Sequence, residues 1–196
     1  MTHTTPETPS SPSSPNKPAV HIRPGGIDDV PTVLAMLDGA VVWMNARGNT
    51  QQWGTTPYSQ KPGGVERIQQ YATEHETYVA ELGGEPVGAM VIGTEPGPQV
   101  RIPSLTEPER YVRLLITDRQ RVGQGIGSVL LAHAVETTRR AGVDLLRVDC
   151  WAGGGGELVA YYERNGFAPT EPFMVGEWPG QVLEMRVGVE GGDGIG

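Results

Sequence analysis

The chain has 196 residues, of which 37% are hydrophobic and 19% are charged, a balance that fits one globular domain with one core. Its formal net charge of -8 disfavours contact with a nucleic-acid backbone, so nucleic acid is not an expected partner. The longest apolar stretch, residues 87–93, is far shorter than the roughly 20 residues that span a bilayer, so no membrane partner is expected either.

Cysteine and histidine are too sparse for a disulfide or a metal site. Cys150 is the single cysteine, so the chain forms no internal disulfide and no cysteine-based zinc site. The four histidines, His3, His21, His75 and His133, show no metal-ligand spacing, so no metal is expected. The first residues lack the basic start and apolar run of a signal peptide, which favours a cytoplasmic location.

Composition divides the chain into three parts. Residues 1–18 hold five prolines and eight serines or threonines and almost nothing apolar, which predicts a disordered leader. Residues 188–196 are glycine-rich and predict a flexible tail. Residues 19–187 contain no repeat of 20 to 50 residues and no second change of composition, so we expect a single folded domain there.

The first half of this domain predicts a strand, two helices and a hairpin. A short strand at 20–25 precedes a helix that starts after Asp28 and Asp29, which are candidate N-caps. The helix has Pro31 in its first turn and a stripe of apolar residues: Val30, Val33, Leu34, Leu37 and Val41. Residues 43–64 show no clear period and predict a long loop or short helical pieces. A second helix through Val65, Ile68 and Ala72 and two antiparallel strands around the turn "GGEP" follow.

The second half predicts a parallel crossover. The strand "RYVRLLIT" is followed by the glycine-rich turn at 122–127, then by a helix that ends near Gly142. The strand "DLLRVDCW", the turn "AGGGGE", a helix that ends at Gly166 and two late strands complete the domain. A strand, helix and strand in this order predict a parallel pair within a mixed sheet.

The glycine-rich turn is a candidate phosphate site. Several glycines between a strand and a helix allow backbone N–H groups to converge at the positive end of the helix dipole. Gly123, Gly125 and Gly127 form GxGxG, which is neither the dinucleotide GxGxxG nor the GxxxxGK[ST] of nucleoside triphosphatases. A plain tight turn is the alternative interpretation of an isolated glycine triplet.

From residue 78 to 167 the chain resembles the GNAT superfamily of acetyl-CoA-dependent N-acetyltransferases. The resemblance is carried by the strand "YVRLLIT", by "GQGIGSVLLAHAVETTRRAG", by a further strand and by "YYERNGF". It implies a mixed α/β fold: a mostly antiparallel central sheet, one parallel strand pair splayed at the acetyl-CoA site, and about four flanking helices. Dimers are common in this family, which favours a homodimer, although the sequence leaves the oligomeric state open.

The resemblance also implies roles for particular residues. It assigns pyrophosphate binding to Val122, Gly123, Gln124, Gly125, Ile126, Gly127 and Ser128. It assigns pantetheine pairing and polarisation of the thioester carbonyl to the backbone of Leu115, Ile116 and Thr117. An alternative register of the phosphate motif uses Gln120, Gly123 and Gly125. Two positions depart from the family pattern: Val122 replaces a glutamine or arginine, and Gly155 replaces an asparagine.

Acetyl transfer to an amine requires a base and an acid. A lysine-like amine is only about 1 part in 2500 neutral at pH 7, so a carboxylate must collect a proton, directly or through water. Asp149 and Glu109 are the candidates because they belong to the two strands that should flank the thioester, and Glu81 is a weaker third. Tyr162 occupies the tyrosine of the family's "YExxGF" signature, so the resemblance makes it the acid that protonates the thiolate. Tyr161 is expected to be structural.

The expected function is transfer of an acetyl group from acetyl-CoA to a primary amine of a small molecule. Aromatic residues in the irregular segments, Trp43, Trp53, Tyr58 and Trp178, either anchor loops or wall a pocket. If they wall a pocket, they and the acidic surface suit a cationic metabolite or antibiotic. Three alternatives stay open: a non-catalytic acetyl-CoA sensor, an acetyltransferase of protein amino groups, and a nucleotide-binding module.

Overall fold

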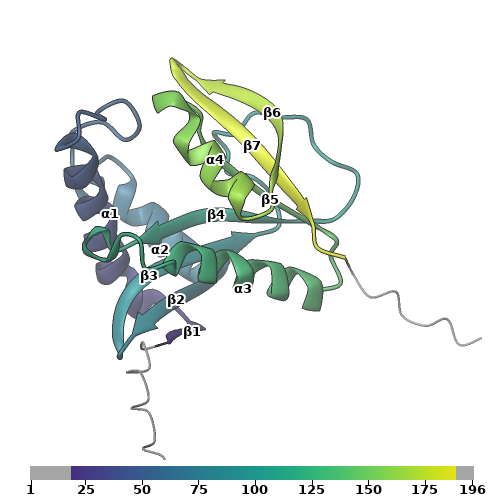
Figure 1. The fold of residues 1–196 in the computed structure, drawn as a ribbon, viewed down its shortest axis with the longest axis horizontal. Helices are drawn as coiled ribbons and strands as arrows, with labels where there is room; N and C mark the ends of the chain where they lie inside the picture. Colours follow the sequence, from purple (N-terminus) through teal and green to yellow (C-terminus); the bar gives the residue numbers. More distant parts are fainter. Residues whose placement is uncertain (1–18, 189–196) are drawn as a thin grey trace, which may run out of the picture.

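The computed structural model describes residues 19–188, which fold around one seven-stranded sheet of order β1-β2-β3-β4-β5-β7-β6 (Figure 1). The predicted leader at 1–18 and positions 189–196 of the predicted tail lie outside the described residues. Neighbouring strands are antiparallel except β4 and β5, which run parallel. The strands are β1 (Val20–Pro24), β2 (Glu76–Leu82), β3 (Glu85–Gly93), β4 (Glu109–Thr117), β5 (Leu145–Trp151), β6 (Ala168–Val175) and β7 (Trp178–Arg186).

Four α-helices cover the two faces of the sheet (Figure 1). They are α1 (Val30–Asn45), α2 (Gly64–Glu74), α3 (Ile126–Arg140) and α4 (Glu157–Arg164), with short 3₁₀ turns η1 (Ile27–Asp29), η2 (Tyr58–Gln60), η3 (Arg119–Arg121) and η4 (Gly154–Gly156). Helices α3 and α4 pack on one face, and α1 and α2 pack on the other. The predicted mixed α/β fold, with one parallel pair and four helices, is confirmed. No helix between residues 19 and 188 has the length and apolar character of a membrane span.

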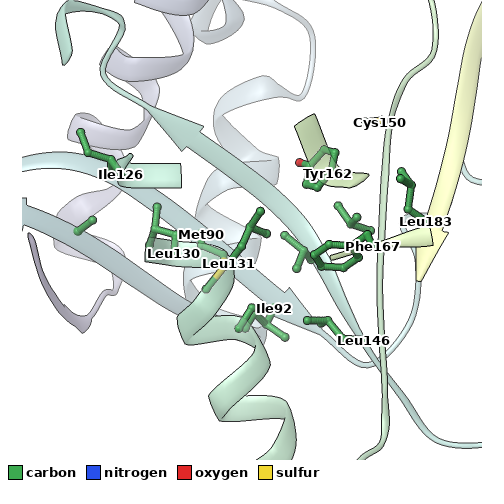
Figure 2. Close-up of a cluster of buried hydrophobic side chains, with 14 of the residues drawn as sticks. Met90, Ile92, Ile126, Leu130, Leu131, Leu146, Cys150, Tyr162, Phe167 and Leu183 are labelled. Carbon is green, nitrogen blue, oxygen red and sulfur yellow. The ribbon is translucent and has the colours of Figure 1, made fainter. Parts of the chain in front are cut away.

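The core on the α3 and α4 side is formed by alternate residues of the strands. Leu146 and Cys150 of β5 and Leu183 of β7 pack against Leu131 of α3 and Phe167 (Figure 2). Successive strand residues point to opposite faces, so Arg147 and Asp149 of β5 are directed to the other face. The polar residues of β5 are thereby placed away from this apolar layer.

A β-bulge in β4 reverses this alternation. Val112 pairs with Ile92 and Leu114 pairs with Val91, so Arg113 is an extra residue without a partner on β3. Val112 therefore packs with the α3 and α4 side, whereas Leu114, two residues later, packs with the α1 and α2 side. The bulge lies next to the point where β4 and β5 stop pairing, and it places Arg113 beside the gap between them.

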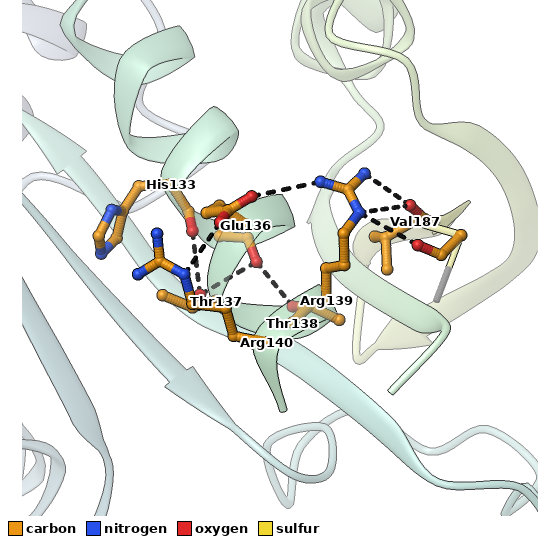
Figure 3. Close-up of polar contacts among 9 residues, drawn as sticks. His133, Glu136, Thr137, Thr138, Arg139, Arg140 and Val187 are labelled. Carbon is orange, nitrogen blue, oxygen red and sulfur yellow. Dashed lines mark hydrogen bonds and ion pairs between the residues drawn. The ribbon is translucent and has the colours of Figure 1, made fainter. Parts of the chain in front are cut away.

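The C-terminal end of α3 is bonded to the segment that follows β7, the last strand of the chain (Figure 3). Arg139 Nη2 donates to the carbonyl of Val187 at 2.7 Å, and Arg139 Nε donates to the carbonyl of Gly188 at 3.1 Å. The hydroxyl of Thr138, which is fully buried, donates to the carbonyl of Ala134 at 2.7 Å. The two bonds of Arg139 join α3 to the segment that follows β7, and the N-terminal end of α3 faces the candidate site.

Candidate active site

A cavity opens where the parallel strands separate. The pairing of β4 with β5 runs from Glu109–Leu145 to Val112–Val148 and ends there. Beyond it, β4 stays paired with β3 as far as Thr117, and β5 stays paired with β7 as far as Trp151. Two open strand edges therefore face each other across a cavity of about 1650 Å³. This volume exceeds that of an ordinary single-ligand pocket and leaves room for two substrates.

The residues expected to pair with pantetheine lie on one of these open edges. Leu115 and Thr117 line the cavity, while the side chain of Ile116 is buried in the core beneath α1 and α2. An exposed strand edge offers backbone N–H and C=O groups to an extended ligand, in the manner of an added strand. The pantetheine arm, with its amide groups, fits such an edge.

The glycine-rich turn forms a cradle of backbone donors at the entrance of α3. Gly123 and Gly125 have positive φ angles of 80° and 77°, which side chains other than glycine rarely adopt. Within residues 19–188, no acceptor binds the N–H groups of Gly125, Ile126, Gly127 or Ser128. Four unpaired donors at the positive end of a 15-residue helix fit a diphosphate.

The start of α3 at Ile126 agrees with the register that uses Gly125 and Gly127 rather than the one that uses Gln120. At Gly127, a Cβ atom would collide with the hydroxyl of Tyr161, so a larger residue would displace the phenol or the turn. All of the predicted pyrophosphate residues line the cavity except Gln124. The departure at Val122 lies at the open rim of the cavity, where this residue is 60% exposed.

A second glycine run, residues 153–156, lines the same cavity, although its sequence alone pointed to no function. Gly154, Gly155 and Gly156 all have positive φ and lead directly into α4. Gly153 and Gly154 lie under the indole of Trp151, where a Cβ atom on either would collide with the ring. The signal in the sequence was four consecutive glycines before a helix. Two glycine-rich helix entrances thus converge on one cavity.

Tyr162 lies on the α3 and α4 side of the cavity, in the same buried cluster as Cys150 and Phe167 (Figure 2). The centre of its ring is 5.9 Å from that of Phe167. Its side chain is 5% exposed, and no described residue forms a hydrogen bond with its hydroxyl. Burial raises the pKa of Tyr162 well above its usual 10, so the phenol stays protonated at physiological pH. Burial also raises the pKa of the neighbouring Cys150 thiol to about 12.

Asp149 lines the cavity from β5, at the end of a buried polar chain. The hydroxyl of Tyr111 donates to Asp149 Oδ1 at 3.0 Å. Arg147 stacks over the Tyr111 ring at 5.7 Å and donates to Glu109 through Nε at 2.5 Å and through Nη2 at 2.8 Å. Burial raises the pKa of Asp149, while the hydrogen bond from Tyr111 lowers it and is the smaller effect.

The structure separates the carboxylates proposed as a base. Asp149 faces the cavity, whereas Glu109 does not line it and is engaged by Arg147 at the far end of the polar chain. Glu81 forms an ion pair with Arg23 at 2.6 Å on the outer strands β1 and β2, also away from the cavity. Among the described residues, no three His, Cys, Asp or Glu side chains gather as a metal site would require.

Four aromatic residues that the sequence placed in irregular segments line the cavity, which agrees with one of their two interpretations. Trp43, Trp53, Tyr58 and Trp178 all line it. Trp43 in fact lies in α1, Tyr58 in η2 and Trp178 in β7, so only Trp53 is in a loop. The indole Nε1 of Trp178 donates to the carbonyl of Gln52 at 2.9 Å, which joins β7 to the loop that follows α1. The cavity is also rich in arginine. Its lining contains Arg47, Arg67, Arg113, Arg119, Arg121 and Arg164, but only two carboxylates, Asp149 and Glu157.

Comparison with known proteins places this fold and cavity in a family of acyl-group transferases. The model of the acetyltransferase (GNAT) family matches residues 43–167, which is more than half of the chain. The chain therefore belongs to the GNAT acetyltransferase family, whose fold binds acetyl-CoA. A search among curated proteins finds no match.

Solved structures share the fold at low sequence identity. A GNAT-family protein from Desulfovibrio desulfuricans is 20% identical with a TM-score of 0.62, and the match covers 87% of this chain and 100% of that one. Ribosomal-protein-alanine N-acetyltransferase from Brucella melitensis is 21% identical with a TM-score of 0.59, covering 85% and 99%. The protein yncA from Salmonella typhimurium, solved with its cofactor acetyl-CoA, is 16% identical with a TM-score of 0.58, covering 89% and 97%.

Proposed function

We propose that this protein transfers an acetyl group from acetyl-CoA to the primary amine of a small molecule. One observation carries the proposal. The gap between β4 and β5 has a candidate base on one face of the sheet and a candidate acid on the other, with a glycine cradle for a diphosphate at one end. The proposed domain, residues 19–187, contains the whole matched segment.

Coenzyme binding is assigned to main-chain groups. The N–H groups at the entrance of α3 hold the diphosphate, and the open edge of β4 through Leu115 and Thr117 pairs with the pantetheine arm. Because these contacts use the backbone, the valine at position 122 does not remove them. Acetyl-CoA supplies the acetyl group as a thioester, whose C–S bond breaks as a C–N bond to the amine forms.

Asp149 is assigned as the proton acceptor. Its carboxylate projects toward the face covered by α1 and α2, where the amine would enter among the aromatic residues. The carboxylate takes a proton from the ammonium form of the amine, directly or through one water, and so generates the neutral nucleophile. Glu109 is too strongly engaged with Arg147 to share this role.

Tyr162 is assigned as the proton donor to the departing sulfur. The high pKa that burial imposes on Cys150 shows how unfavourable a thiolate is on this side of the cavity. A sulfur that leaves as a thiolate here would therefore need a proton, and the phenol of Tyr162 supplies one. After the C–N bond has formed, the nitrogen still carries one proton more than the amide product, and this proton passes to solvent. The proton gained by Asp149 also passes to solvent, from which the phenolate of Tyr162 is reprotonated.

The part of the cavity where the amine would bind is bridged over by the protein, which supports a small-molecule acceptor. The Trp178 to Gln52 hydrogen bond joins two segments that both line the cavity, β7 and the loop after α1. An acceptor must fit beneath this bridge, which favours a small molecule or a thin chain end over the surface of a folded protein.

The test is acetyl-CoA-dependent thiol release with a panel of amines, measured for the wild type, Tyr162→Phe and Asp149→Asn. We expect kcat to fall about 100-fold or more in each variant, since each removes a proton-transfer group, while the Kd for acetyl-CoA stays near the wild-type value. Full kcat in Tyr162→Phe at every pH would remove this tyrosine from the mechanism. Acetyl-CoA binding without thiol release from any amine would contradict the proposal and favour a sensor.

A further inference from the structure

We infer that the amine acceptor carries an oxyanion, a carboxylate or a phosphonate-like group, that binds between Arg67 and Arg113 on the α1 and α2 side of the cavity. This inference rests on the proposed acetyl transfer and names the class of its second substrate. It reverses the expectation of a cationic acceptor, which was based on the net charge of the whole chain.

The charge around the cavity is opposite to the charge of the molecule. The chain has a formal charge of -8, but the cavity lining holds six arginines against two carboxylates. Arg121 in η3 immediately precedes the phosphate cradle, and Arg164 ends α4, so both come from the side assigned to the coenzyme. Arg119 of η3 lies over the Trp43 ring at 5.1 Å. Arg47, Arg67 and Arg113 come from the end of α1, from α2 and from the bulge of β4, where the acceptor would enter.

Arg67 and Arg113 converge on Tyr71. Arg67 lies four residues before Tyr71 on α2, so both project from the same face of the helix. The guanidinium of Arg113 lies 5.6 Å from the centre of the Tyr71 ring. All three line the cavity together with Tyr58, whose pKa is raised by burial, so its hydroxyl remains a hydrogen-bond donor. Two cations and a phenol thus surround one part of the cavity.

Neither arginine has a carboxylate partner in the described part of the chain. Arg113 Nη1 donates to His75 Nε2 at 2.6 Å and Nη2 donates to the carbonyl of Pro96 at 3.2 Å, and both acceptors are neutral in this arrangement. Its Nε is buried without a hydrogen-bond partner. Arg67 forms no ion pair with any residue between 19 and 188. A half-buried guanidinium such as that of Arg113 is ordinarily paired with an anion, so the missing anion is expected to come from the ligand. Arg67 is exposed and needs no partner of its own, which leaves its guanidinium available to the same ligand.

Asp149 does not supply that anion. Its positive neighbour Arg113 lowers its pKa, but no contact within 4.0 Å joins the two, and Asp149 is instead bonded to Tyr111. A base must stay free to take a proton from the amine. An acceptor with its amine toward Asp149 and its oxyanion toward Arg67 and Arg113 satisfies both groups, because a planar guanidinium binds a carboxylate or phosphonate through paired hydrogen bonds.

The first experiment compares matched acceptors with the wild-type protein. L-Alanine, L-methionine and L-phenylalanine are assayed beside their C-terminal amides, with β-alanine, 2-aminoethylphosphonate and spermidine as further amines. We expect kcat/KM for the best anionic acceptor to exceed that of its amide by about tenfold or more. A preference for 2-aminoethylphosphonate over β-alanine would support the site and assign it to a phosphonate-like group. Turnover of only amides or spermidine would overturn the inference and leave acetyl transfer intact. No turnover of any amine would overturn the proposed function itself.

The second experiment tests Arg67 directly. Arg67→Gln should lower the ratio of acid to amide kcat/KM about tenfold through a higher KM for the acid, and Arg67→Lys should recover part of this loss. Arg140→Gln is the matched control, because it removes another exposed arginine at the far end of α3 (Figure 3). An unchanged ratio in Arg67→Gln, or an equal fall in Arg140→Gln, would overturn the inference.

Discussion

Burial and a hydrogen bond from Tyr111 together set the charge state of the Asp149 carboxyl. Burial raises the pKa of Asp149 above its usual value, and the hydrogen bond from Tyr111 partly reverses that rise. If Asp149 is the base, activity depends on its ionised form and is lost as the pH falls through its pKa. The acid limb of kcat/KM should therefore lie above the ordinary carboxyl range.

Tyr111→Phe makes this dependence measurable. The variant loses the hydrogen bond that favours the carboxylate, so the pKa of Asp149 should rise further and the acid limb should move to higher pH, by about one unit for one charge-favouring hydrogen bond. The measurement is kcat/KM between about pH 5 and pH 9 for wild type and variant, a window that lies above the ordinary aspartate pKa of about 4. An acid limb that does not move, in a variant that melts normally, would show that another group titrates.

Two adjacent tyrosines on α4 place their hydroxyls in different parts of the site because of helix geometry. Neighbouring residues on an α-helix point in directions about 100° apart, so the hydroxyls of Tyr161 and Tyr162 diverge although their ring centres lie 5.3 Å apart. The structure directs Tyr162 into the core beside Cys150 and directs the hydroxyl of Tyr161 to Gly127 in the phosphate cradle. The pattern "YYERNGF" indicated an important tyrosine. The contact of Tyr161 with the cradle depends on the docking of α4 against α3, which the pattern does not contain.

At the scale of the element, the first turn of α3 can pack against the hydroxyl of Tyr161 because Gly127 has no side chain. In Gly127→Ala the new Cβ would collide with the Tyr161 hydroxyl, so the phenol or the turn must move. We expect acetyl-CoA binding to weaken about tenfold, since displacing the turn disturbs N–H groups that a diphosphate would contact. The measurement is the Kd for acetyl-CoA by calorimetry.

Two further variants distinguish this steric cause from a general effect of alanine. Gly127→Ala combined with Tyr161→Phe removes the colliding oxygen and should recover most of the affinity. Gly39→Ala changes a glycine of α1 that has open space around it, so it should keep the affinity and raise stability by about 0.5–1 kcal/mol. A double variant as weak as Gly127→Ala alone would contradict the steric explanation.

The strand β4 shows where periodicity stops being informative. The text "RYVRLLIT" predicts a strand correctly because it is rich in β-formers, and its position before the glycine turn predicts the crossover. The bulge at Arg113 cannot be read from it, since alternation alone would place Val112 and Leu114 on one face. The side-chain directions that matter for the cavity follow from the register with β3, which is a tertiary property.

At the scale of the whole molecule, we expect the ion pair of Glu109 with Arg147 to stabilise the fold and to take no part in the chemistry. Arg147 is 1% exposed, and both of its bonds to Glu109 lie in the buried polar layer between the sheet and its cover. Glu109→Ala would leave a buried guanidinium unpaired, so the free energy of unfolding should fall by about 3–5 kcal/mol. The measurement is urea denaturation.

Two controls accompany this variant. Glu136→Ala breaks the exposed pairs with Arg139 and Arg140 and should change stability by less than about 1 kcal/mol. Glu109→Ala combined with Arg147→Met removes both charges and should recover much of the loss. If Glu109 were the base, this stabilised double variant would be inactive, whereas we expect it to retain acetyl transfer.

The distribution of charge is another whole-molecule property that composition conceals. A net charge of -8 describes the total over the entire surface, and it favoured a cationic ligand. Folding gathers six of the arginines around one cavity and leaves most carboxylates elsewhere. A ligand in the cavity interacts mainly with the nearby charges, because salt screens the interaction with charges that lie more than about 10 Å away.

The amino-acid sequence by itself determined the order of strands and helices, the parallel crossover and the glycine-rich helix entrance, because these depend on short-range patterns of apolar residues and backbone-permissive glycines. Only the tertiary structure decided which carboxylate faces the cavity, which tyrosine touches the phosphate cradle and which charges surround the acceptor. Those features depend on distances between residues such as Tyr111 and Asp149, which are 38 positions apart and meet only when β4 and β5 pair.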